Sequence, residues 1–88
     1  METRIAVAGI IVENIDSVEK LNSILHDYGD HIVGRMGIPY REKNLNIMSI
    51  VIDASQNVIS EFTGKIGKLD GVSAKTAYSK VVTKNDNQ

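Results

Sequence analysis

The sequence predicts an α+β fold, a ferredoxin-like βαββαβ sandwich in which a four-stranded antiparallel sheet carries both helices on one face. Short runs rich in β-branched residues alternate with two segments whose apolar residues recur at three- and four-residue steps. These are the patterns of strands and of amphipathic helices. The second and third apolar runs are separated by a polar turn too short to hold a helix, so they form an antiparallel hairpin.

The first strand is predicted over 5–12, because this run is apolar, β-branched and too short for an amphipathic helix. We expect it to be a central, well-covered strand. A helix then begins at Asp16, which forms a capping box with Glu19. Gly29 follows the helix directly and is expected to end it in the left-handed conformation. The apolar face of this helix is predicted to consist of Val18, Leu21, Ile24, Leu25 and Tyr28.

The second strand is predicted over 32–38, with side chains alternating between two faces. One face is expected to carry Ile32, Gly34, Met36 and Ile38, and the other His31, Val33, Arg35 and Gly37. Pro39 cannot donate a hydrogen bond to a neighbouring strand, so it indicates a strand end or an edge. The polar turn 41–44 then leads into a third strand, predicted over 45–53.

A second helix is predicted after Ser55, which is positioned to cap it. Its buried face is expected to consist of Val58, Ile59, Phe62, Ile66 and Leu69. Gly64 and Gly67 weaken its later turns, by about 1 kcal/mol each relative to alanine in an exposed helix interior. The turn 69–72 leads into the last strand, where Val72, Ala74, Thr76 and Tyr78 alternate with Ser73, Lys75, Ala77 and Ser79. We assign residues 1–80 to a single domain and 81–88 to a polar C-terminal tail.

The predicted strands carry apolar residues on both faces, although the two helices cover only one. In the third strand, Met48, Ile50 and Ile52 oppose Ile47 and Val51. An apolar sheet face without a helical cover needs a partner, and the expected partner is a second copy of the chain. A chain of 88 residues is also only marginally stable alone. We therefore expect a homodimer or a homotetramer.

Composition argues against several classes of protein. The net charge of −1 is unlike that of a chain built to neutralise phosphates, and the central strands lack the aromatic residues on which RNA bases stack. The absence of cysteine excludes disulfides and thiolate metal sites, and it fits a reducing compartment. The sequence begins without a signal-peptide pattern, and no apolar run has the length of a membrane span. We expect a cytoplasmic protein that contacts neither membranes nor, directly, nucleic acid.

No constellation of residues in the sequence is typical of an enzyme or a metal site. His26 and His31 lie five residues apart without companion ligands, so a structural role is favoured over metal binding. The segment 64–68 combines glycines and lysines, but it lies at the end of a predicted helix, where the dipole disfavours an anion. We therefore expect no catalytic residues, no metal and no cofactor.

The segment 34–42 combines glycines and a proline with side chains that bind anions. Arg35 is expected in the middle of the strand, where its planar guanidinium can meet a carboxylate, a phosphate or a carbonyl. One interpretation is a small-ligand pocket at a subunit interface, with Arg35, Gly37, Tyr40 and Arg41 as candidates. The other is structural and is favoured: Arg35 pairs with an acidic residue, the glycines permit close backbone approach, and Pro39 blunts an edge.

Three segments of the chain resemble the iron-only hydrogenase system regulators. They are AGIIVE (8–13), GRMGIPYR (34–41) and GKIGKLDGVSAKTAYSK (64–80), and the similarity runs from about Arg4 to Lys80. The resemblance implies an ACT-like domain, similar to the C-terminal effector domain of the nickel-responsive repressor, that stands alone and self-associates through its sheets. It also implies a role in regulating the expression or assembly of a hydrogenase.

Two departures from related domains limit what the resemblance implies. The repressor binds nickel through histidines and a cysteine, and the corresponding stretch 35–45 has neither residue. Amino-acid-binding ACT domains often use a glycine after the first strand, where this chain has Glu13-Asn14-Ile15-Asp16. The predicted function is a non-enzymatic regulatory domain that self-associates and binds a small anionic ligand at a subunit interface. The alternative is a pure protein–protein interaction or oligomerisation module without a small-molecule ligand.

Overall fold

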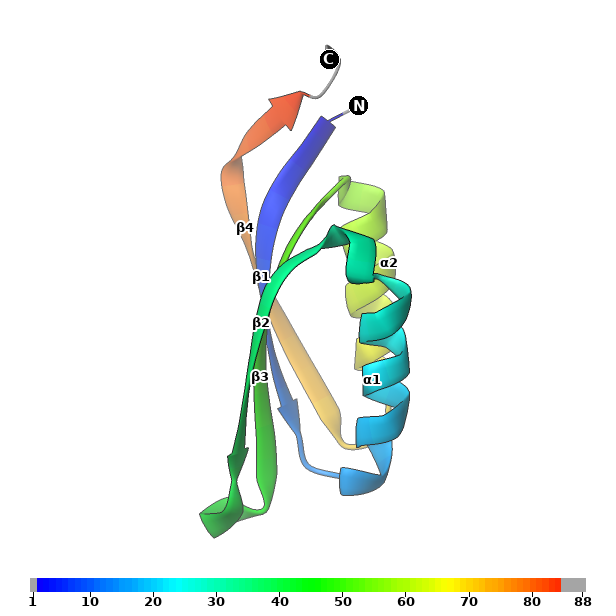
Figure 1. The fold of residues 1–88 in the computed structure, drawn as a ribbon, viewed down its shortest axis with the longest axis vertical. Helices are drawn as coiled ribbons and strands as arrows, with labels where there is room; N and C mark the ends of the chain where they lie inside the picture. Colours follow the sequence, from blue (N-terminus) through cyan, green and yellow to red (C-terminus); the bar gives the residue numbers. More distant parts are fainter. Residues whose placement is uncertain (1, 85–88) are drawn as a thin grey trace.

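The computed structural model describes residues 2–84 and has the predicted order of elements (Figure 1). The strands are β1 (Glu2–Val12), β2 (Ile32–Tyr40), β3 (Leu45–Ala54) and β4 (Val72–Lys84). The α-helices are α1 (Val18–Asp27) and α2 (Gln56–Gly67). Three short 3-10 helices connect them: η1 (Ile15–Ser17), η2 (Gly29–His31) and η3 (Arg41–Lys43).

The four strands form one antiparallel sheet in the order β2-β3-β1-β4. The central strands are therefore β1 and β3, and the edges are β2 and β4. Both helices lie on the same side of the sheet, and no other part of residues 2–84 covers the opposite side (Figure 1). This arrangement confirms the predicted ferredoxin-like, ACT-like sandwich.

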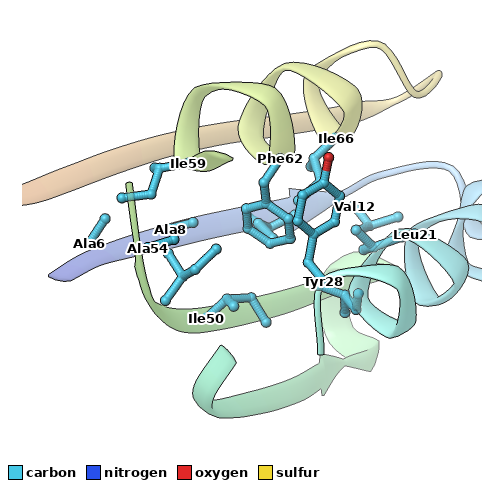
Figure 2. Close-up of a cluster of buried hydrophobic side chains, with 13 residues drawn as sticks. Ala6, Ala8, Val12, Leu21, Tyr28, Ile50, Ala54, Ile59, Phe62 and Ile66 are labelled. Atoms are coloured by element: carbon cyan, nitrogen blue, oxygen red, sulfur yellow. The ribbon is translucent and has the colours of Figure 1, made fainter. Parts of the chain in front are cut away.

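The hydrophobic core lies between the sheet and the two helices (Figure 2). Its buried members are Ala6, Ala8, Ile10, Val12, Leu21, Leu25, Tyr28, Ile50, Ile52, Ala54, Ile59, Phe62 and Ile66. Phe62 is fully buried, and its ring meets that of Tyr28 edge to face, with 5.1 Å between the centroids. Four residues of the predicted helix faces, Val18, Ile24, Val58 and Leu69, are only partly buried at the margin of this core.

Tyr28 connects the two helices through its polar end. Its hydroxyl donates to Oε1 of Glu61 at 2.6 Å, and Nζ of Lys65 lies 5.1 Å from its ring centroid. The hydrogen bond to Glu61, together with burial, raises the pKa of Tyr28 above its ordinary value. A raised pKa favours the protonated hydroxyl in the folded state. This contribution to stability is therefore complete below about pH 10 and is lost only as the pH rises through the folded-state pKa.

The start of the first helix differs from the prediction. Asn14, and not Asp16, is the capping residue, because its Oδ1 accepts a hydrogen bond from the Asp16 amide at 3.0 Å where η1 begins. Ser17 precedes α1, but its hydroxyl donates to the carbonyl of Asp70 at 2.6 Å. The Asn14 side-chain amide donates to Oδ2 of the same Asp70 at 2.9 Å. The predicted capping box of Asp16 and Glu19 is wrong, because the polar side chains before α1, Asn14 and Ser17, bind Asp70 in the turn before β4.

The end of the first helix also differs, and the prediction of a left-handed Gly29 is wrong. Gly29 begins η2, and Gly71 is the glycine with positive φ, 68°, within residues 2–84. The backbone amide of Tyr28 donates to the carbonyl of Ile24 at 3.2 Å, and that of His31 donates to the carbonyl of Tyr28 at 2.9 Å. A 3-10 turn thus satisfies carbonyls at the end of α1 without a left-handed residue.

A β-bulge interrupts β2 near its start, between Ile32 and Gly34. Ile32 pairs with Ile52 and faces the helices, whereas Gly34 faces the opposite side together with Met36 and Ile38. The prediction that Ile32 shares a face with these three residues is therefore wrong. One extra residue in the strand reverses the alternation that a regular strand would follow.

The last strand is longer than the sequence pattern indicates. It continues to Lys84, so residues 81–84 of the expected tail lie on β4, and residues 85–88 lie outside the described residues. The division of the chain at residue 80 stays a prediction, as does the cytoplasmic location. Neither of the helices described here is long and apolar enough to cross a membrane.

Candidate functional site

The sheet face that points away from the helices is largely apolar. The register places Ile38, Ile47, Ile11 and Ser73 in one row across the sheet, then Met36, Ser49, Gly9 and Lys75, then Gly34, Val51, Val7 and Ala77. We call these rows, with Ile5 and Asp53 beyond the third, the open face. Val7 and Ile11 are 40% and 41% exposed, and Met36 is 60% exposed. The expectation of a well-covered first strand thus holds only on its helix side.

Two features distinguish the open face from a uniform apolar surface. Gly9 has no side chain in the middle row, and a hollow of about 480 Å³ lies beside it, between Ile11, Ile47 and Lys75. Lys75 and Asp53 add charges of opposite sign on different strands. An apolar surface with one acid and one base is suited to pairing with a copy of itself.

The β2–β3 hairpin extends past the helices at one end of the molecule (Figure 1). There, a hollow of about 340 Å³ lies between the hairpin and the segment after β1. We call it the hairpin hollow. Its lining residues are Glu13, Ile15, Pro39, Tyr40, Arg41, Asn44, Leu45 and Asn46. The lining combines a guanidinium, a phenol, two amides and a carboxylate with apolar side chains, which is a set able to bind an organic acid.

The local sequence explains how the hairpin hollow is shaped. Asn44 adopts the left-handed conformation, with φ of 54°, and its amide donates to the carbonyl of Arg41 at 3.2 Å. Asparagine is one of the few residues that adopt this conformation readily. This turn places Arg41 and Asn44 at the end of the hairpin. In the described part of the chain, the Arg41 side chain has no ion pair or hydrogen-bond partner.

The four predicted site residues do not form one pocket. Tyr40 and Arg41 line the hairpin hollow, but Arg35 pairs with Ile50 and Gly37 with Met48, so both of these face the helix side of β2. Gly37 lines an apolar slot of about 250 Å³ beside α1, and Arg35 lines a separate depression of about 420 Å³. The hollows that Arg35 and Arg41 line therefore lie at different places along the hairpin and share no lining residue.

Glu13, Ile15, Asn44 and Asn46 line the hairpin hollow and were not among the candidate residues. Asn44 could have been found from the polar turn, because asparagine in a tight turn is typical of the left-handed conformation. Glu13 could have been found only from the topology, since antiparallel pairing of Val12 with Asn46 brings the end of β1 to the hairpin. No group of three or more His, Asp or Glu side chains is arranged to hold a metal ion among residues 2–84.

Comparison with known proteins identifies the family. The model of the TM1266-like family, described as "Iron-only hydrogenase system regulator, putative", matches residues 4–76, a range that contains the whole hairpin. The chain belongs to this family. The resemblance that the sequence predicts is thereby confirmed, and the TM1266-like family carries the description of a regulator.

Solved structures agree with this assignment. The uncharacterized protein TM1266 from Thermotoga maritima is 30% identical, with a TM-score of 0.85 over 89% of this chain and 99% of that chain. A formyltetrahydrofolate deformylase from Pseudomonas putida KT2440 has a TM-score of 0.60 over 83% of this chain and 28% of that chain, at 4% identity. The second likeness shows a shared fold alone. No curated protein matches this member of the TM1266-like family.

Proposed function

We propose that this chain is a non-enzymatic regulatory domain of an iron-only hydrogenase system that self-associates through the open face and binds a small anionic ligand in the hairpin hollow. The family description supports the regulatory role. The observation that carries the proposal is the open face, a largely apolar surface on the side of the sheet that the helices leave uncovered. Control of hydrogenase expression would then act through assembly of the domain or through its ligand.

The physical argument for self-association is the exposed apolar area. Burial of such surface stabilises a contact by about 25 cal/mol for each Å² removed from water. Ile11, Met36 and Ile38 are each more than 40% exposed. A two-fold axis between two open faces would bury these rows, and it would allow Lys75 of each copy to approach Asp53 of the other.

The first test places a charge in the open face. Ile11→Glu is expected to convert a dimer or tetramer into monomers, because an isolated carboxylate buried between two sheets has no partner. Light scattering and sedimentation of the purified protein measure the mass, and circular dichroism checks the fold. Asn57→Glu adds the same charge on the exposed surface of α2 and should leave the mass unchanged. A monomeric wild type, or an Ile11→Glu variant of unchanged mass, would contradict the proposal.

The argument for an anionic ligand rests on Arg41 and Tyr40. The Arg41 guanidinium lines the hairpin hollow without an ion pair to residues 2–84, and a carboxylate or phosphate would provide charge-assisted hydrogen bonds. Tyr40, 38% exposed, offers a ring and a hydroxyl beside it. Glu13 lines the same hollow, so it disfavours ligands with several negative charges and favours an organic acid that also carries a hydrogen-bond donor.

The second test is a thermal-shift and calorimetric screen of amino acids, nucleotides and organic acids. A compound that binds should lose about tenfold in affinity, equal to about 1.4 kcal/mol, in Arg41→Ala, because the charge-assisted hydrogen bond is lost. The matched control Arg35→Ala should retain the affinity, since Arg35 lies in a different depression. If no compound binds, or if binding survives Arg41→Ala, the ligand is excluded and the pure interaction module becomes the better account.

A further inference from the structure

Two hollows adjoin on the helix side of β2, and we call them together the groove. The slot beside Gly37 is lined by residues of α1, β2 and β3 that include Val18, Leu21 and Met48. The depression beside Arg35 is lined by Leu25, His26, Gly29 and Ile32. Asn22 of α1 lines both hollows, so they lie next to each other along the helix. The groove is thus bounded by α1 on one side and by the edge strand β2 on the other.

The groove exists because β2 lies at the margin of the helical cover. Apart from Ile32, every residue of β2 is exposed. Gly37 has no side chain to fill the space beside α1. Nothing lies within 4 Å of the position that a Cβ would occupy there. On the α1 side, the buried residues Leu21 and Leu25 give the groove an apolar lining.

The outer edge of β2 is open over a short stretch. It is an edge of the sheet, so one row of its backbone groups has no strand partner within the described chain. The bulge between Ile32 and Gly34 and the proline at 39 leave 35–38 as the regular part. The opposite edge, β4, carries three lysines, which discourage strand addition, whereas β2 has a single charged residue, Arg35.

Arg35 gives the groove a positive end. Within residues 2–84 its side chain has no ion pair and no hydrogen-bond partner. The imidazole of His26 lines the same depression, and no carboxylate is among the lining residues. An acidic side chain would therefore complement this end, while an apolar side chain would complement the slot beside Gly37.

We propose that the groove binds an extended peptide segment of a partner protein, added as a further strand along β2. Its acidic side chain lies beside Arg35 and His26, and its apolar side chain lies over Gly37. Because Arg35 and Gly37 are two residues apart on one face, the partner's two side chains are also two apart. Backbone hydrogen bonds to the edge provide affinity, and the two hollows provide selectivity. The slot adjoins the hairpin hollow, since Pro39 and Asn46 line both, but Arg35 and Gly37 do not line that hollow, and the proposal does not depend on a ligand there.

The test is selection from a display library of random peptides against the full chain, followed by fluorescence anisotropy with the selected peptides. We expect enrichment of an acidic and an apolar residue at a spacing of two. Affinity should fall by about tenfold or more in Arg35→Glu, through charge reversal, and in Gly37→Leu, which fills the slot. Lys80→Glu carries the same charge change on the opposite edge strand, β4, and should bind the peptides as the wild type does.

Four results would overturn the proposal. They are the absence of the spaced motif, equal binding of the peptides by Arg35→Glu, a change in the mass of the assembly in Arg35→Glu, and binding of phosphate alone with the same dependence on Arg35. A changed mass would mean that a second copy occupies the β2 edge. Failure of the ligand screen at Arg41 affects none of these measurements, so the two sites are tested independently.

Discussion

Phe62→Ala is expected to reduce the free energy of unfolding by about 4 kcal/mol, within the range observed for loss of a buried aromatic ring. Phe62 is fully buried between the helices and the sheet, and its ring packs edge to face on Tyr28 (Figure 2). The substitution removes the apolar contacts and leaves a cavity that the rigid β1 and β3 strands cannot close. Urea unfolding followed by circular dichroism, at one fixed protein concentration, measures the loss.

Two variants bracket the Phe62 result. Phe62→Leu keeps most of the volume and should lose less than Phe62→Ala. Ile15→Ala removes an apolar side chain that is 74% exposed, so its effect should stay within about 0.5 kcal/mol of the wild type. A loss in Phe62→Ala as small as that in Ile15→Ala would show that the ring is not at the centre of the core.

Gly71→Ala is expected to destabilise the fold by about 3 kcal/mol, because strain and a steric clash add. Gly71 has φ of 68°, and an added Cβ would lie 2.6 Å from Cβ of Asn14 and 3.0 Å from its amide nitrogen. The clash would separate the turn before β4 from the segment after β1. That junction holds the 2.6 Å hydrogen bond from the Glu13 amide to the Gly71 carbonyl. The same unfolding measurement applies.

Two matched variants separate the causes at Gly71. Gly64→Ala lies in α2 with open space around the added Cβ and should stabilise the protein by up to about 1 kcal/mol. Gly71→Asn tolerates the left-handed conformation but retains the clash with Asn14, so it should remain destabilised. Wild-type stability in Gly71→Ala would mean that the turn moves freely relative to Asn14.

The sequence predicts the fold because each element has its own local signal. The two segments with apolar residues at three- and four-residue steps form the helices, and the β-branched runs form strands. The turn 41–44 is so short that the strands on either side of it must form a hairpin. The errors lie where a distant residue decides the local geometry. Asn14 rather than Asp16 caps the first helical turn because Asp70, from the other half of the chain, binds both Asn14 and Ser17.

The candidate site could be predicted only in part for a related reason. Tyr40 and Arg41 are neighbours in the sequence, so they line one hollow. Arg35 shares their segment but lies five residues before Tyr40 on the strand, where it pairs with Ile50 and lines a different depression beside α1. Glu13 lines the hairpin hollow because the pairing of β1 with β3 brings the end of β1 to the hairpin. No local sequence pattern encodes this pairing.

The bulge in β2 gives this strand one position at which its length can change without a change in what its faces present. Loss of one residue at Val33 would restore regular alternation from Ile32 onward. Ile32 would still face the helices and Gly34 would still face away from them, so the residues that follow would keep their present faces. Loss of one residue within 35–38 would instead exchange the faces of the residues after it. Over evolutionary time, we expect changes of length to be accepted at the bulge far more readily than within 35–38.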